Sequence, residues 1–215
     1  TLDEFNSRHA KYVGEAGFEL ALPPGSTKTD SHMILYQREA APLRLEAYLA
    51  CALTGLTIEE RKHVFQVSDI VTAVCNELEV KVYEPRKATD PVKHPDVSAE
   101  KVFQIDRQHV LSSDLVIHVC DYPSTGSGEE LDFALGALIP IVLISQAETR
   151  VSRMVTGIPG FKLIITYTDL DELRFELTER LREIRPILEE RKLTFSGFDK
   201  NIVGNRIRQL REELH

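Results

Sequence analysis

The sequence is poor in cysteine, with three residues in a chain of 215. Cys51, Cys75 and Cys120 each lie within an apolar strand or helix pattern. Neither they nor the histidines have partners at the spacing of a metal site, so His109 and His118 are expected to pack rather than to bind metal. We therefore predict reduced core cysteines, no metal and no cofactor.

Long apolar runs are also lacking, and no segment approaches the length of a membrane-spanning helix. Residues 1–20 do not have the pattern of a secretory signal peptide. Acidic residues outnumber basic ones and give a net charge of −8, which argues against a chain that binds nucleic acid along its whole length. We expect a cytoplasmic protein that makes no contact with membranes.

From residue 45 onward, apolar strand patterns alternate with amphipathic helices. Buried strands are predicted over five segments, 45–51, 80–83, 115–120, 140–144 and 161–166. Helices are predicted between them, over about 58–78, 98–112 and 128–138. This alternation predicts an α/β fold with a doubly wound, flavodoxin- or Rossmann-like parallel sheet of five strands and a long C-terminal helix.

The predicted domain organisation has four parts. Residues 1–44 form an N-terminal extension without clear periodicity, and residues 45–168 form the α/β domain. Residues 169–198 form a long charged helix that Pro186 should bend. Its apolar stripe could cover the sheet or serve a dimer, and we expect a homodimer. Residues 199–215 form a separate short segment.

The segment Asp121–Glu130 is the strongest candidate site, because it follows an apolar strand and is rich in small residues. Small residues let a ligand approach the backbone, and the start of a helix offers free amides to an anion. A glutamate such as Glu130 could then act as a nucleophile. The alternative is a capping box, in which Ser127 caps the helix and Glu130 reaches back to the Ser127 amide.

A second carboxylate, Asp106, strengthens the interpretation as a site. On the predicted helix over 98–112, Asp106 lies in the middle of the apolar stripe formed by Val102, Phe103, Ile105 and Val110. A carboxylate in that place must be paired or hydrogen-bonded, so a structural role in capping a neighbouring loop stays open. Asp106 and the 124–130 segment flank the same strand, and both can meet at its carboxyl end, where ligands bind in open α/β sheets.

The order of Tyr48, Asp106, Ser124 and the run Gly126–Leu131 resembles the nucleoside 2-deoxyribosyltransferase-like family. It is most similar to the branch of 5′-nucleotide N-glycosidases. The resemblance covers roughly residues 45–145. It implies that Glu130 attacks the anomeric carbon of the sugar and that Asp106 orients this nucleophile or protonates the base. Tyr48 completes the implied catalytic set.

The residue at position 124 separates two branches of that family. Transferases that use free nucleosides tend to carry an aspartate there, whereas nucleotide-cleaving relatives carry a serine that holds the 5′-phosphate. Ser124 therefore favours a nucleotide, although it could also be a simple turn residue. The predicted substrate-binding residues are Thr54, Ser124, Gly126, Ser127 and Gly128.

Three features depart from the nucleotide-cleaving pattern. The segment 52–56 lacks the serine and arginine that often hold phosphate, with Thr54 as its only polar side chain, and Glu129 adds negative charge beside Glu130. Asp132 also replaces the glycine that usually follows Glu-Leu.

Two classes of function follow from these residues, an enzyme that cleaves or transfers the sugar of a nucleoside 5′-monophosphate and a module that senses a nucleotide without catalysis. The segment 204–213 favours the sensor, since it resembles the first helix of a repressor-type helix-turn-helix. It could equally be an ordinary amphipathic helix, and DNA is an expected partner only if a complete motif follows residue 215. A TIR-like NAD-cleaving domain is a third, weaker alternative. The sequence does not specify the base or the sugar.

Overall fold

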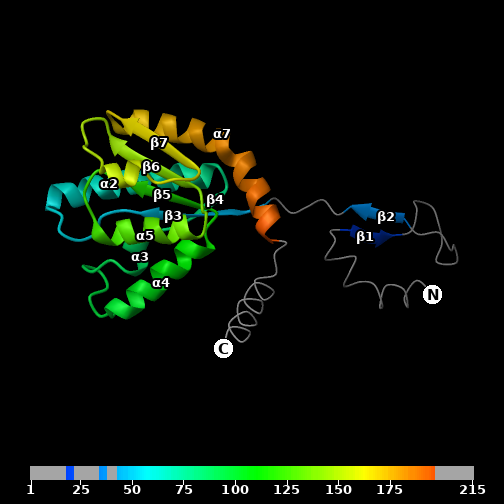
Figure 1. Cartoon of the computed structure of the whole chain (residues 1–215), viewed down its shortest axis with the longest axis horizontal. Coiled ribbons are helices and arrows are strands. Elements are labelled where there is room, and N and C mark those ends of the chain that lie inside the picture. Colours follow the sequence, from blue (N-terminus) through cyan, green and yellow to red (C-terminus); the bar gives the residue numbers. More distant parts are fainter. Residues whose placement is uncertain (1–17, 22–33, 38–42, 197–215) are drawn as a thin grey trace. The chain divides into compact units, whose positions relative to one another are not determined.

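The computed structural model describes residues 18–21, 34–37 and 43–196. The chain divides into two compact units, Thr1–Leu43 and Arg44–His215. In the first unit, β1 (Phe18–Ala21) pairs with β2 (Ile34–Gln37) in an antiparallel ladder (Figure 1). This pair was not predicted from the sequence, which gives no clear strand pattern there.

The second unit contains the predicted sheet of five parallel strands. In chain order these are β3 (Leu45–Ala50), β4 (Val80–Tyr83), β5 (Leu115–Val119), β6 (Ile141–Gln146) and β7 (Lys162–Tyr167). Their spatial order is β4-β3-β5-β6-β7, and every neighbouring pair is parallel. The chain winds from β3 to one side and then returns to the other, so the crevice at the carboxyl ends of β3 and β5 is the switch point where ligands bind in such sheets.

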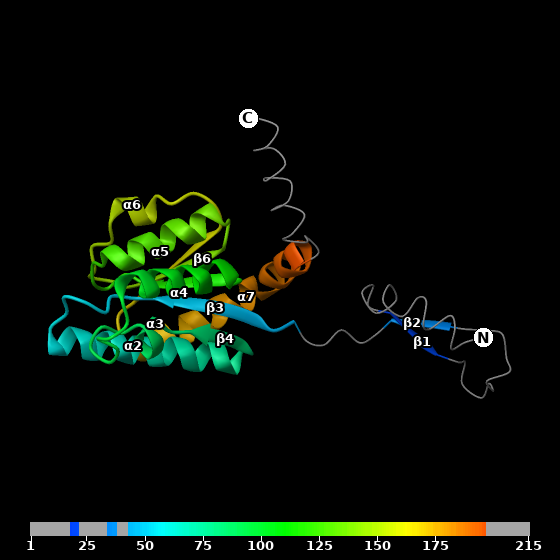
Figure 2. The same cartoon turned by 90° about the horizontal axis from the view of Figure 1, so that it is seen from below.

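Helices cover both faces of this sheet (Figure 2). α2 (Ile58–Glu77) and α7 (Leu170–Ser196) pack on one face, and α4 (Ala99–Ser112) and α5 (Thr125–Gly136) pack on the other. The short helices α3 (Pro85–Ala88) and α6 (Arg153–Thr156) lie in connecting segments. The α/β fold predicted from the sequence is therefore confirmed, including its long C-terminal helix.

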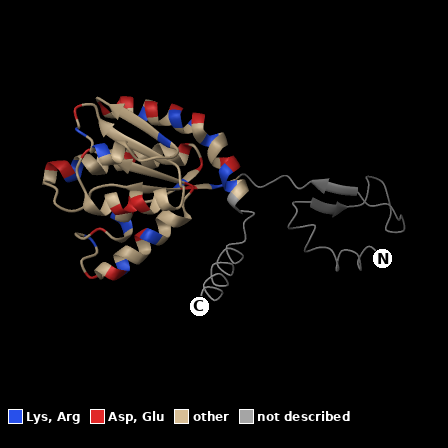
Figure 3. Cartoon of the chain, viewed as in Figure 1, with Lys and Arg blue, Asp and Glu red and all other residues tan. Residues whose placement is uncertain are grey.

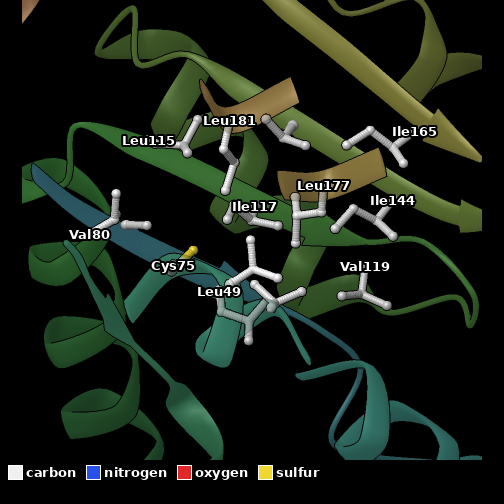
Figure 4. Packing of buried hydrophobic residues seen from close by; sticks show 14 of the residues in the cluster. Leu49, Cys75, Val80, Leu115, Ile117, Val119, Ile144, Ile165, Leu177 and Leu181 are labelled. Carbon is white, nitrogen blue, oxygen red and sulfur yellow. The ribbon is translucent and has the colours of Figure 1, made fainter. Parts of the chain in front are cut away.

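The apolar stripe of α7 packs on the sheet. Leu177 and Leu181 point toward Ile117 and Leu115 of β5 (Figure 4), and α2 completes the same core with Val64, Val67, Val71 and Val74. Pro186 lies inside α7, and the helix continues to Ser196. The stripe, which the sequence could assign either to the sheet or to a dimer, is thus buried within the unit. Dimerisation itself stays a prediction.

Charged residues lie mainly on the outer faces of the helices, while the strands carry few (Figure 3). On α7 they form ion pairs one turn apart, Arg180–Glu183, Arg182–Glu179 and Arg185–Glu189. Such exposed pairs contribute only about 0.3–0.5 kcal/mol each. The helix therefore owes its place mainly to its buried leucines. No helix in the described ranges is both long enough and apolar enough to span a membrane.

Candidate functional site

Glu130 and Tyr48 form the centre of the candidate site. Tyr48 is wholly buried on β3, and its hydroxyl donates to Oε1 of Glu130 at 2.7 Å. The other carboxylate oxygen, Oε2, is buried and has no hydrogen-bond partner among the described residues. A buried polar atom without a partner is costly, so its presence calls for an explanation such as catalysis or a ligand.

The helix that carries Glu130, α5, begins earlier than the sequence predicted. The predicted start at Gly128 is wrong, and so is the alternative in which Ser127 caps the helix: Ser124 is the N-cap, and its Oγ accepts from the Ser127 amide at 3.3 Å. The small residues that follow Ser124 fit the first helical turn without crowding. Glu130 therefore lies in the second turn and does not form a capping box.

The surroundings of Glu130 favour its neutral form. Burial raises the pKa of its carboxyl group to about 8, and the negative charges of Asp106 and Glu129 act in the same direction. The hydrogen bond from Tyr48 lowers this pKa but does not cancel the effect of burial. In the same way, burial and the adjacent carboxylates raise the pKa of Tyr48, whose hydroxyl stays a donor.

Asp106 is buried on α4, as its place on the apolar stripe predicted, and its oxygens accept from two hydroxyl groups. Thr89 Oγ1 lies 3.1 Å from Oδ2, and Tyr83 Oη lies 3.3 Å from Oδ1. Burial raises the pKa of Asp106, while the bonds from Thr89 and Tyr83 and the nearby His109 lower it. Neither Thr89 nor Tyr83 was predicted as a site residue.

The two carboxylates line one cavity of about 590 Å³. Thr54 and Gly126, both predicted as substrate-binding residues, line it as well. The segment between β4 and α4 contributes Thr89, Pro91, His94, Pro95 and Val97 to the lining, and two aromatic side chains, Phe103 and Phe133, line the cavity as well. A mostly apolar cavity with a few convergent polar groups is typical of small-molecule sites.

The remaining predicted substrate-binding residues lie elsewhere. Ser124 and Gly128 line a separate cavity of about 660 Å³ together with Arg150 and Ser152. Ser127 is buried and contributes to neither lining. The structure thus brings together Tyr48, Asp106, Glu130, Thr54 and Gly126, but places the side chain of Ser124 beside a different cavity.

The two histidines discussed in the sequence pack against other side chains. His109 stacks on Tyr83, with ring centroids 3.6 Å apart. His118 is buried, which lowers its pKa to about 4. Within the part of the chain that the structure describes, no group of three or more His, Cys, Asp or Glu residues could hold a metal ion.

Comparison with known proteins finds similar folds but no close relative. Neither a scan against protein-family models nor a search of curated proteins gives a match. The solution structure of BlsM aligns with a TM-score of 0.51 at 16% identity, covering 66% of this chain and 91% of that one. The chain shares its fold with BlsM.

Two further solved structures are similar at lower scores. The CMP N-glycosidase BcmB of Clostridium botulinum has a TM-score of 0.45 and 18% identity, over 61% of this chain and 97% of its own. A 2-deoxyribosyltransferase from Bacillus psychrosaccharolyticus has a TM-score of 0.45 and 25% identity, over 60% and 90%. The helix-turn-helix likeness falls outside the described residues.

Proposed function

We propose that this protein breaks the N-glycosidic bond of a nucleoside 5′-monophosphate, or transfers its sugar, with Glu130 as the nucleophile. The observation that carries the proposal is the state of the Glu130 carboxyl group. One oxygen accepts from Tyr48, and the other is buried and has no hydrogen-bond partner among the residues that the structure describes. The same carboxyl group lines a cavity together with Asp106. That arrangement fits a nucleophile whose direction of attack is fixed.

In the proposed reaction, ionised Glu130 attacks the anomeric carbon as the bond to the base nitrogen breaks. The base leaves with the bonding electrons and takes a proton from Asp106, which gives a glycosyl ester on Glu130. Water, deprotonated by Asp106, then attacks the same carbon and releases the sugar and the glutamate. Another base in place of water would complete a transfer. Paired carboxylates in retaining glycosidases divide the work in this way.

The raised pKa of Glu130 sets a condition on this mechanism. In the free protein the carboxyl group holds its proton up to a pH of about 8, and a protonated acid is a poor nucleophile. The proton must therefore leave Glu130 before attack. Because Glu130 and Asp106 interact, they titrate as a pair, and the pH profile reports the pair rather than either residue alone.

The preference for a nucleotide is the finer part of the proposal. Gly126 belongs to the first turn of α5 and lines the cavity, as Thr54 does, so the lining includes a residue of a helix N-terminus and a hydroxyl donor. Glu129, which also lines the cavity, opposes a phosphate by its charge. Comparing the binding of each nucleotide with that of its nucleoside therefore tests this part separately from the glycosidase activity.

The deciding experiment is a panel of ribo- and deoxyribonucleoside 5′-monophosphates and the matching nucleosides, with free base measured by chromatography. We expect base release from at least one nucleotide, faster than from its nucleoside. Glu130→Gln should lower the rate at least about a hundredfold, because it removes the nucleophile. Glu129→Gln, a change at the exposed neighbouring residue, should not lower the activity, because it removes a charge that opposes the phosphate. Equal rates in the wild type and Glu130→Gln would refute the proposal.

A sensor of nucleotides is the second candidate, and the protonation of Glu130 at neutral pH favours it, since a neutral acid can bind a base edge without attacking a sugar. Calorimetric titration of the same nucleotides distinguishes the two. Binding without release of base over many hours would favour the sensor.

A further inference from the structure

Two neighbouring tyrosines, Tyr48 and Tyr83, contact the two carboxylates of the candidate site. Tyr48 on β3 and Tyr83 on β4 are direct partners in the parallel register, so their side chains lie on the same face of the sheet. Their rings stack with centroids 5.5 Å apart and an angle of 24° between the planes. Tyr48 donates to Glu130, and Tyr83 donates to Asp106. Each carboxylate thus has its own tyrosine.

The Tyr83 ring is fixed on more than one side. Besides Tyr48, the imidazole of His109 stacks on it with 12° between the planes. Burial raises the pKa of Tyr83, and the adjacent Asp106 raises it further, so the phenol keeps its proton. A protonated hydroxyl on a fixed ring gives Asp106 a donor of constant direction.

Thr89 complements Tyr83 because its hydroxyl can both donate and accept. Thr89 Oγ1 lies within hydrogen-bond distance of both oxygens of Asp106 and, at 3.2 Å, of the Pro85 carbonyl oxygen. When Asp106 is ionised, Thr89 can donate to it. When Asp106 is protonated, it can donate a hydrogen bond to Thr89 Oγ1. The Thr89 hydroxyl then donates its own hydrogen bond to the Pro85 carbonyl oxygen. Both states of the acid are therefore satisfied in a buried place, where an unpaired group would be costly.

We propose that Tyr83 and Thr89 are positioning residues that hold Asp106 in place through both halves of a proton-transfer cycle. The proposal rests on the function proposed above, because it supplies what a buried acid and base needs. Neither residue needs to touch the substrate's reacting atoms, since both act through Asp106. The titratable groups that face Asp106 are Tyr48, Tyr83, His109 and Glu130.

The hydrogen bonds from Tyr83 and Thr89 to Asp106 can be tested without any substrate. The pKa of Asp106 is measured from its carboxyl ¹³C shift, and the resonance is assigned with Asp106→Asn. Tyr83→Phe keeps the stacked ring and removes only the donor, so the pKa of Asp106 should rise by at least about half a pH unit. Thr89→Val should raise it as well, and Thr89→Ser should restore it. Tyr122→Phe, which alters a tyrosine without a hydrogen bond to Asp106, is the control and should leave it unchanged.

The enzymatic test then measures kcat and KM against pH in the same variants. Tyr83→Phe and Thr89→Val should lower kcat about tenfold and change KM little. The limb of the kcat–pH profile that reports the ionisation of Asp106 should move with the pKa of Asp106. An unchanged Asp106 pKa in both variants would overturn the proposal, whatever the activity. A shifted pKa in a protein that releases no base would uphold the positioning contacts and refute the proposed function.

Discussion

Glu130 couples the site to the stability of the whole chain. In the folded protein its pKa is about 8 rather than the usual 4.5. Between these values the folded state keeps a proton that the unfolded chain has lost. The free energy of unfolding must therefore fall as the pH rises through this window, and the loss is complete above about pH 8.

Glu130→Gln removes this pH dependence, because glutamine resembles the protonated glutamate and does not ionise. We expect the variant to match the wild type near pH 4 and to become more stable by a few kcal/mol, in order of magnitude, above pH 8. Urea unfolding of both proteins at several pH values measures the difference, and titrating groups that do not interact with Glu130 cancel in it. If the two stability curves run parallel between pH 4 and 9, Glu130 ionises normally.

Single residues also mark how far the sequence could predict the site. Asp106 was predictable, because a carboxylate on an apolar helical stripe needs a partner. Thr89 and Tyr83 were not, since Thr89 lies in an irregular segment and Tyr83 ends a short strand without any polar pattern. Ser124 was predicted to face the substrate, but its hydroxyl accepts from the helix it caps. Local sequence cannot distinguish a cap from a ligand when both need the same hydroxyl group.

At the scale of elements, one arginine joins two walls of the cavity. Arg61 on α2 donates to the Leu53 carbonyl oxygen at 3.0 Å and forms an ion pair with Asp90, whose side chain is fully buried. Leu53 precedes Thr54, and Asp90 follows Thr89, so the pair fixes two segments that line the cavity. Burial acts to raise the pKa of Asp90, but Arg61 and the Val92 amide outweigh it and hold that pKa below its usual value.

Arg61→Met should therefore destabilise the protein by about 2–3 kcal/mol, because it leaves the buried Asp90 without its counter-charge while Arg61 itself is partly exposed. It should also weaken nucleotide binding, since both walls lose their link. Arg180→Met, which breaks only exposed pairs on α7, is the matched control and should cost less than about 1 kcal/mol. Chemical unfolding compares the two, and equal losses would mean that solvent screens the Arg61–Asp90 pair.

For the molecule as a whole, the sequence predicted the architecture well, because strands buried on both faces produce continuous apolar runs that are hard to mistake. The spatial order of the strands could not be predicted in the same way, since periodicity does not indicate which strands are neighbours in the sheet. The antiparallel pair β1–β2 was missed because its segments are short and lack a repeating pattern. The apolar stripe of α7 indicated burial but could not say against which surface.

The buried stripe of α7 leads to a test of the core. Leu177 is fully buried between α7 and the sheet, so Leu177→Ala should lower the free energy of unfolding by about 2–5 kcal/mol. Phe175 on the same helix is 64% exposed, and Phe175→Ala should change the free energy of unfolding by no more than about 0.5 kcal/mol. Urea denaturation of both variants measures this. Comparable effects at the two positions would place the stripe on a surface rather than in a core.

The register of β3 and β4 also limits how this cavity can change during evolution. Adjacent strands lie about 4.8 Å apart, a spacing set by backbone hydrogen bonds and independent of side chains. Since Tyr48 and Tyr83 are register partners, the gap between their hydroxyl groups is tied to this fixed unit of length. Loops and helices around the cavity can then change during evolution so that the cavity binds new ligands. The two tyrosines keep the distance between the carboxyl groups of Glu130 and Asp106 unchanged.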